Sequence, residues 1–375
     1  MKIVLVNHQE PDNINAFSGI PYFMTRAIKR AFEEVIDYND FESHHTGNRV
    51  FEGHYRSSLR PIGNRLTNFL KNNAIEADFL LCQGGNTSIP FYNHHLPIVF
   101  WHDATWSSYF KAYQTTRLFN QFKADYRNLY LWDKQVLERA DLLIYASDYI
   151  AEACIKHYKI PERKIKVVPF GANLFPSPPD DLLHNALKTR AQSKVINLTF
   201  IGKDWKRKGL TLAYHLVKKL NAMGIGTKLN IVGGTPDIGY IKQSEAVNMI
   251  GFIDKSDPLQ HEKLEEILKT THFMVHPASW EPFGIVLCEA NAYGIPVFAL
   301  DLEGPKTIIR PGKNGFLFQQ HNFVNAACQK IKEIAGNFDN NYVPLFKSTV
   351  EEYQHRLNWD TSAQQVKNIL MNFHR

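Results

Sequence analysis

Short apolar runs that alternate with segments of helical character are the feature that most constrains the fold of this chain. The runs include Lys2–Asn7, Phe79–Gln83 and residues 97–101. Runs of this length and composition are typical of buried parallel strands joined by helices. The alternation stops at a proline-rich stretch, residues 175–181, and then restarts. The sequence therefore predicts an α/β fold of two doubly wound, Rossmann-like units.

The chain length supports this division into two units. A chain of 375 residues is longer than one ordinary hydrophobic core supports. We place the boundary at the proline-rich stretch, so that residues 1–176 form the N-terminal unit and residues 177–359 the C-terminal unit. In doubly wound folds, ligands bind at the carboxyl ends of the strands. We therefore expect the ligand in a central cleft between the two units.

Composition limits the kinds of partner. The hydrophobic share of 44% and the charged share of 21% are those of a soluble globular protein. A net charge of +6 permits anionic ligands or an acidic membrane surface, but the Lys and Arg residues are spread along the chain, which argues against nucleic acid. The four cysteines show no paired spacing, so we expect neither a zinc site nor a disulfide framework.

The cysteine spacing and the lengths of the apolar runs indicate the cellular compartment. Unpaired cysteine spacing favours a reducing environment. No apolar run approaches the ~18 residues that span a bilayer, and the first apolar run is too short for a signal peptide. We expect a cytoplasmic protein, with peripheral contact at the inner face of the membrane left open.

The stretch 276–300 contains two glutamates, Glu281 and Glu289, eight residues apart. Pro282 and the Gly294 that follows Tyr293 predict a helix over residues 282–293. The free N–H groups at its start would form an anion site. A ligand with hydroxyls at both ends and negative charge between them, such as a nucleotide-sugar, fits this pattern. Alternatively, Glu289 is a solvated surface charge and Glu281 only complements the helix dipole.

Two further signals follow predicted strands. After the strand 197–201 comes GKDWKRKG (202–209), where Lys203 and Lys208 could clamp a diphosphate. The alternative is an ordinary solvated loop. His102 closes the run 97–101 and could hydrogen-bond a sugar hydroxyl or carry a proton, unless it is a structural histidine.

Five segments in this order resemble the family 4 glycosyltransferases (glycosyl transferases group 1). They are WHDAT (101–105), VPFGAN (168–173), IGKDWKRKGL (201–210), EPFGIVLCEA (281–290) and Asn358-Trp359. The resemblance implies a GT-B fold and a retaining, hexosyltransferase-type enzyme of glycan biosynthesis that uses a nucleoside-diphosphate sugar. It also implies that the N-terminal unit binds the acceptor, that the C-terminal unit binds the donor, and that a helix over 360–375 crosses back to the N-terminal unit.

The resemblance assigns roles to individual residues. Glu281 would face the hydroxyls of the donor sugar, Glu289 would accept from the ribose, and His102 would contact the sugar. Lys203 and Lys208 would neutralise the diphosphate. The remaining donor-binding positions are Phe283, Gly284, Ile285 and Val286 through their backbone N–H groups, together with Gly19, Gly202 and Phe252. Two positions depart from the family: Lys203 stands where an arginine is usual, and Gly19 where a Gly-Gly pair is usual.

The chemistry expected of these residues is electrostatic. When a nucleoside diphosphate leaves, negative charge grows on its bridging oxygen, and preorganised cations and N–H groups stabilise that charge. The chain has no Asp-x-Asp pair, so we expect a metal-independent enzyme without a cofactor. The acceptor is expected to be a glycan, a lipid-linked sugar or a protein. A sugar-nucleotide epimerase and an inactive nucleotide-sugar-binding subunit are the alternatives.

Overall fold

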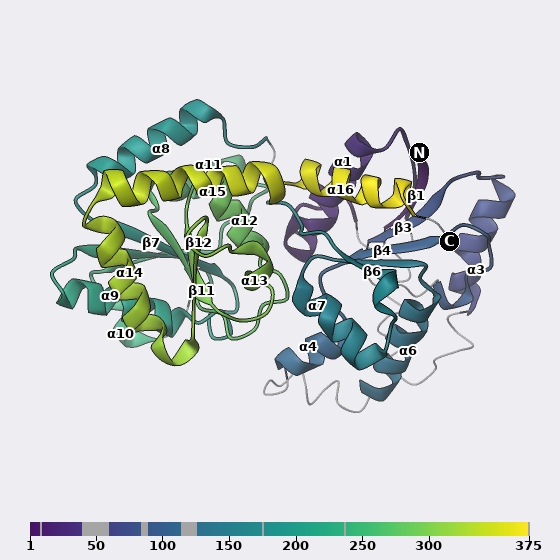
Figure 1. Cartoon of the computed structure of the whole chain (residues 1–375), viewed down its shortest axis with the longest axis horizontal. Helices are drawn as coiled ribbons and strands as arrows, with labels where there is room; N and C mark the ends of the chain where they lie inside the picture. The colour runs from purple at the N-terminus through teal and green to yellow at the C-terminus, as the bar shows by residue number, and fades with distance from the viewer. Residues whose placement is uncertain are drawn as a thin grey trace. The chain divides into compact units, whose positions relative to one another are not determined.

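The computed structural model describes residues 1–7, 10–39, 60–83, 89–113, 126–174, 176–235 and 238–373. The chain forms two compact units, one of Met1–Pro169 with Ser362–Arg375 and one of Phe170–Thr361. Each unit contains a six-stranded parallel sheet with helices on both faces, which confirms the predicted pair of doubly wound α/β units (Figure 1). The stretch expected to link them begins at Phe175, which lies outside the described residues.

The first unit is built on a sheet of strand order β2-β1-β3-β4-β5-β6. Its strands are β1 (Lys2–Asn7), β2 (Glu34–Asn39), β3 (Phe79–Gln83), β4 (Ile98–His102), β5 (Leu142–Tyr145) and β6 (Ile165–Val167). Every residue of β3 and β5 is buried, as expected for central strands covered on both faces. The edge strand β2 has a half-exposed pattern.

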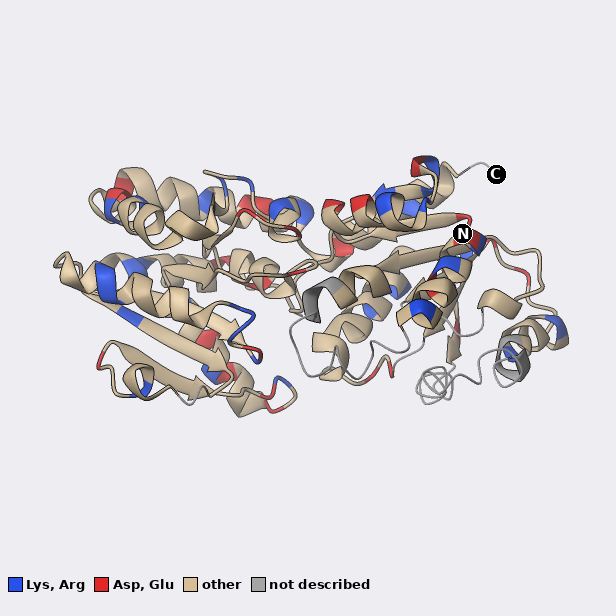
Figure 2. Ribbon diagram, turned by 90° about the horizontal axis from the view of Figure 1, so that it is seen from below, with Lys and Arg blue, Asp and Glu red and all other residues tan. Residues whose placement is uncertain are grey.

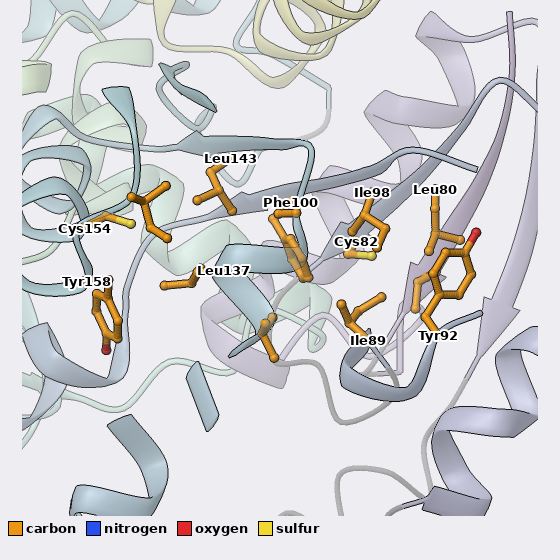
Figure 3. Close-up of a cluster of buried hydrophobic side chains, with 14 of the residues drawn as sticks. Leu80, Cys82, Ile89, Tyr92, Ile98, Phe100, Leu137, Leu143, Cys154 and Tyr158 are labelled. Atoms are coloured by element: carbon orange, nitrogen blue, oxygen red, sulfur yellow. The ribbon is translucent and has the colours of Figure 1, made fainter. Parts of the chain in front are cut away.

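The helices of the first unit are α1 (Ile20–Ala31), α3 (Arg60–Asn72), α4 (Trp106–Tyr113), α6 (Tyr126–Arg139), α7 (Asp148–Ala153) and most of α16 (Trp359–Met371). Side chains of the central strands form a continuous apolar core with α6 and the turn after α7. Figure 3 shows part of this cluster, including Leu80, Phe100, Leu143, Leu137 and Tyr158.

One carboxyl group lies inside this core. Asp133 on α6 accepts hydrogen bonds from the Trp106 backbone N–H (2.9 Å) and the Tyr158 hydroxyl (2.5 Å). Burial raises the pKa of Asp133 from 3.8 to about 6, although both hydrogen bonds act to lower it. Asp133 therefore ties the start of α4 to α6.

The second unit has strand order β12-β11-β10-β7-β8-β9. Its strands are β7 (Ile196–Gly202), β8 (Thr227–Gly233), β9 (Val247–Gly251), β10 (Phe273–His276), β11 (Val297–Leu300) and β12 (Gly315–Phe318). Its helices are α8 (Asp180–Gln192), α9 (Leu210–Ala222), α10 (Gly239–Lys242), α11 (Pro258–Thr270), α12 (Ile285–Ala292), α13 (Pro305–Ile308), α14 (Phe323–Ala335) and α15 (Val343–Arg356). Figure 2 shows that Lys and Arg are interspersed with Asp and Glu over the helices of both units.

A buried arginine joins three helices of the second unit. Arg190 at the end of α8 is 1% exposed. Its guanidinium donates to the carbonyls of Leu268 and Lys269 in the last turn of α11, at 3.0 and 3.1 Å. It also donates to the carbonyls of Tyr293 and Gly294, directly after α12, at 2.9 and 3.1 Å. These are the negative ends of two helices, so the cation is satisfied by helix dipoles and orphan carbonyls.

The two ends of the second unit meet. The Ala172 N–H donates to the Leu357 carbonyl at 2.8 Å, and the Trp359 indole N–H donates to the Asn173 side-chain oxygen at 2.8 Å. A Cβ atom on Gly171 would lie 2.0 Å from the Trp359 nitrogen, so only glycine fits there. Helix α16 begins at Trp359, close to the expected residue 360.

Candidate functional site

The two glutamates lie on either side of the start of α12. The predicted helix over 282–293 begins three residues later than expected, at Ile285, because Gly284 adopts a left-handed conformation (φ 102°) as its N-cap. Glu281 is on the loop after β10, and Glu289 is inside α12. Both are buried, at 7% and 4% exposure, so Glu289 is not the solvated surface charge that was its alternative.

Glu281 is surrounded by basic groups at one of its two oxygens. Its Oε2 is paired with the Lys208 ammonium, lies 3.1 Å from the His276 Nε2, and lies 4.0 Å from Arg207 Nη1. Burial alone would raise the pKa of Glu281, but Lys208 and His276 together hold it well below its usual range. The other oxygen, Oε1, accepts no hydrogen bond from the described residues and is not sealed from solvent.

His276 closes β10 and is completely buried. Burial, with Lys208 nearby, lowers the pKa of His276, so its ring is neutral at pH 7. Because the Glu281 carboxylate can only accept, the ring proton is on Nε2 and Nδ1 is an acceptor. That Nδ1 atom has no partner among the described residues. His276 therefore fixes the direction of the Glu281 side chain.

The backbone of Glu281 is fixed from a separate segment, the turn before α13. The Glu281 N–H donates to the Glu303 carboxylate at 3.1 Å, and the Gly304 N–H donates to the Glu281 carbonyl at 3.0 Å. A Cβ atom on Gly304 would lie 2.4 Å from the Pro282 carbonyl oxygen. Glu303 itself has a positive φ of 49°, a conformation that costs a non-glycine residue about 1–3 kcal/mol. The loop that carries Glu281 is held rigidly.

The basic loop after β7 brings Lys208 to this position. A Cβ atom on Gly202 would lie 2.9 Å from Lys208 Cγ, so the glycine leaves room for the lysine stem. At Gly209 a Cβ atom would lie 2.1 Å from the Pro277 carbonyl oxygen, and the Ser279 N–H donates to the Arg207 carbonyl at 2.9 Å. Lys208 and Glu281, predicted as parts of one site, do lie together.

Lys203 contacts a different group. Its ammonium lies 4.2 Å from the centre of the Phe252 ring, a cation–π distance. Phe252 follows β9 and is 52% exposed. The structure thus places Lys203 beside Phe252, another of the predicted donor-binding residues.

Glu289 forms a salt bridge with a different lysine, Lys255. Lys255, in the loop between β9 and α11, places its ammonium 2.6 Å from Glu289 Oε1. The second oxygen, Oε2, accepts no hydrogen bond from the described residues and is not sealed from solvent. Glu281 and Glu289 therefore share one arrangement, in which one oxygen is held by a cation and the other is open.

Between the two glutamates lies the N-terminal turn of α12. The Phe283 side chain is buried against Phe170, with ring centres 5.5 Å apart, so only its backbone can serve a ligand. The first N–H groups of a helix, here those of Ile285 and Val286 with the N-cap Gly284, have no acceptor within the helix and lie at its positive end. This turn suits an anion.

Two predicted residues belong to the first unit. His102 ends β4, is partly exposed, and has its ring centre 5.0 Å from that of Phe100. Gly19 is the N-cap of α1 with φ 88°, and it follows two further left-handed residues, Phe17 and Ser18. Their roles in catalysis or binding stay predictions.

Four residues near the glutamates were not singled out from the sequence: His276, Lys255, Arg207 and Glu303. His276 carried the signal that singled out His102, since it also closes an apolar run. Lys255 and Glu303 are in loops without any periodic pattern, and their contacts with the glutamates form only in the fold.

No group of three or more His, Cys, Asp or Glu side chains suited to a metal ion occurs within the ranges that the structure describes. Over the same residues, no helix combines the length and the apolar character needed to cross a bilayer. Metal independence and the expected location stay predictions.

Residues 185–337 match the family model described as Glycosyl transferases group 1. The second unit carries a glycosyl transferases group 1 domain. This group 1 domain contains Glu281, Glu289, Lys203 and Lys208. The resemblance predicted from the sequence motifs is therefore confirmed for this domain.

Relatives and solved structures agree with this assignment. A D-inositol 3-phosphate glycosyltransferase of Nocardia farcinica is 25% identical over 197 residues, which are 50% of this chain and 44% of that protein. The chain thus spans about half the length of such curated relatives. Sucrose-phosphate synthase from Thermosynechococcus elongatus has a TM-score of 0.70 at 19% identity, covering 99% of this chain and 98% of its own.

A second solved structure, Anabaena Alr3699/HepE in complex with UDP and glucose, has a TM-score of 0.66 at 15% identity and covers 100% of both chains. These likenesses extend over the group 1 domain and the first unit alike. The fold is the GT-B fold expected from the sequence.

Proposed function

We propose that this protein is a glycosyltransferase that moves a sugar from a nucleoside-diphosphate sugar to an acceptor hydroxyl. The observation that carries the proposal is the shared arrangement of Glu281 and Glu289. Each carboxylate is buried, each has one oxygen paired with a lysine, and each keeps its other oxygen open. An ionised carboxylate oxygen can only accept hydrogen bonds, so its ligand must carry donor groups such as hydroxyls.

The donor lies along α12 in this proposal. Sugar hydroxyls donate to Glu281 Oε1, the ribose donates to Glu289 Oε2, and the diphosphate meets the N-terminal turn between them. The base is placed beside Phe252, whose ring is exposed. HepE, a protein of the same fold, was solved with UDP and glucose, which supports uridine nucleotides as the first probes.

The reaction breaks the bond between the anomeric carbon and the diphosphate oxygen and forms a bond from that carbon to the acceptor oxygen. The proton of the acceptor hydroxyl passes to the departing diphosphate. Negative charge grows on the departing diphosphate. Lys203, Lys208 and the helix N–H groups stabilise this charge, and each well-placed donor contributes ~2.7–4 kcal/mol to lowering the barrier. Lys208 then interacts with the diphosphate as well as with Glu281.

The finer features of the proposal rest on the sequence resemblance. They are retention of anomeric configuration, a hexosyl donor and independence from metal ions. They also include contact of His102 with the sugar, and of Gly19 with phosphate or acceptor, in the first unit. A carbohydrate or lipid-linked acceptor, reached from the cytoplasm with peripheral contact to the membrane, completes the proposal.

A transfer assay with Glu281→Ala tests the role of the open oxygen. The matched control is Glu266→Ala, because Glu266 is an exposed glutamate of the same unit. We expect the control to transfer sugar at the wild-type rate and Glu281→Ala to lose at least about 100-fold. A wild-type rate in Glu281→Ala would refute the assigned role.

Two outcomes would favour other functions. Rapid formation of an epimeric nucleotide-sugar without acceptor would indicate an epimerase. Donor binding without turnover across a broad panel of glycan, lipid and protein acceptors would indicate a binding subunit that has lost catalysis.

A further inference from the structure

Lys255 is a basic residue of the second unit that neither the sequence motifs nor the proposed reaction explain. It lies in the loop between β9 and α11, 34 residues from Glu289, yet its ammonium is 2.6 Å from Glu289 Oε1. Its side chain is 26% exposed, whereas that of Glu289 is 5% exposed. The pair is therefore partly buried, with the carboxylate on the inner side.

The loop that carries Lys255 is fixed on both sides of the lysine. Before it, the Asp254 N–H donates to the Gln260 side chain at 2.9 Å. After it, the Ser256 N–H and hydroxyl both donate to Asp254 Oδ1, at 2.9 and 2.6 Å. Asp257 then caps α11 by accepting from the Leu259 N–H at 3.0 Å. Little freedom remains in the backbone of Lys255, so the position of its ammonium is set by the fold.

This geometry has a consequence for Glu289. A carboxylate on a helix can rotate about its side-chain bonds and present either oxygen to a ligand. Here the ammonium occupies Oε1, which leaves Oε2 as the oxygen that accepts no hydrogen bond from the described residues. The lysine also supplies the counter-charge without which a buried carboxylate is costly. Lys255 thus decides which oxygen is offered.

We propose that Lys255 is a positioning residue that gives the nucleotide site its preference for ribose over deoxyribose, by fixing Glu289 so that Oε2 accepts from a ribose hydroxyl. This inference rests on the proposed function, because it needs a nucleotide at the group 1 domain. A hydroxyl bound to a charged acceptor contributes enough to favour the ribonucleotide by about 10-fold or more. Loss of Lys255 would reduce that preference.

The experiment is calorimetric titration of the full-length protein with UDP, ADP, GDP and CDP, followed by the 2′-deoxy and 3′-deoxy forms of the tightest binder. The variants are Lys255→Met, Lys255→Arg and, as a matched control from the adjacent α11, the exposed Lys263→Met. We expect wild type and Lys263→Met to prefer the ribonucleotide by at least about 10-fold, Lys255→Met to lose most of this preference, and Lys255→Arg to retain it.

A second variant covers the case in which Lys255→Met leaves a buried charge and fails to fold. Lys255→Met combined with Glu289→Gln removes both charges, and we expect it to fold and to bind ribo and deoxy forms equally. Wild-type discrimination in Lys255→Met, or in the folded double variant, would overturn the inference while leaving the proposed function intact. Failure of every nucleotide to bind the wild-type protein would overturn both.

Discussion

Arg190 gives the sharpest test of how the second unit is held together. Replacement by methionine keeps most of the side-chain volume and removes the guanidinium. Three backbone carbonyls, those of Lys269, Tyr293 and Gly294, would then lose their donor, whereas the Leu268 carbonyl would keep the Thr271 N–H. Arg190→Met therefore tests whether the ends of α11 and α12 depend on one buried cation.

The magnitude follows from this geometry. Each buried carbonyl left unsatisfied costs about 1–3 kcal/mol, so three would cost several kcal/mol, and removal of the desolvated cation offsets part of that loss. Breaking a buried charged network typically costs about 3–5 kcal/mol, and we expect about 4 kcal/mol for Arg190→Met. Arg190→Lys, which keeps the charge but has only one donor nitrogen, should lose about half as much.

The assay must report on the second unit alone, because two units need not unfold together. Hydrogen exchange of peptides from α11 and α12, measured by mass spectrometry in increasing urea, meets this need. Lys188→Met is the control, since Lys188 is an exposed residue of the same helix, and it should change stability by less than about 0.5 kcal/mol. A loss below about 1 kcal/mol in Arg190→Met would refute the reasoning.

Four further predictions concern pH, packing and metal. Burial lowers the pKa of His272 from 6.5 to about 4. Between these two pH values the unfolded chain binds a proton that the native ring does not, so folding becomes less favourable as the pH falls. The free energy of unfolding of the second unit, measured by urea titration, should fall by about 3 kcal/mol between pH 6.5 and 4. The raised pKa of Asp133 has the opposite effect on stability, because the native carboxyl binds its proton at a higher pH than the unfolded one. As the pH falls from 6 to 4, the free energy of unfolding of the wild type should rise by up to about 3 kcal/mol relative to Asp133→Asn. Hydrogen exchange at α4 and α6 measures this difference. Gly202→Ala places a methyl group against Lys208 Cγ and should lower turnover by up to about 100-fold. Gly239→Ala is the control, because a Cβ atom there meets nothing within 4 Å, and it should keep the wild-type rate. Equal rates in the two variants would show that the lysine stem has room to move. Transfer should persist after dialysis against EDTA, and activity that vanishes and returns with Mn²⁺ would contradict metal independence.

The strands that the sequence missed share one place in the fold, the edges of the two sheets. The runs at β1 and β3 matched their strands residue for residue, because these strands lie between two neighbours and are apolar. Strands β2, β9 and β12 were not predicted, and all three are sheet edges. An edge strand pairs on one side only and keeps polar or half-exposed residues, so its apolar signal is weak.

The same reasoning applies to the candidate site. Glu281, Glu289 and Lys208 stand next to strand ends or helix starts, where spacing and composition indicate their place. His276 and Lys255 decide how those glutamates are directed, yet their importance depends on contacts between segments distant in sequence. A lysine such as Lys255, in a short polar loop, looks like any other surface charge until the fold places it 2.6 Å from a buried carboxylate.

The contact between the two ends of the second unit has a consequence for the chain as a whole. Gly171 and Trp359 touch through their backbones, so the polypeptide enters and leaves the group 1 domain at a single point, and the domain is an insertion that closes on itself before α16. Because the two ends of the insertion lie next to each other, removing or exchanging it leaves two chain ends that are already close enough to rejoin. The two units could therefore diversify independently, each as a module with its own core.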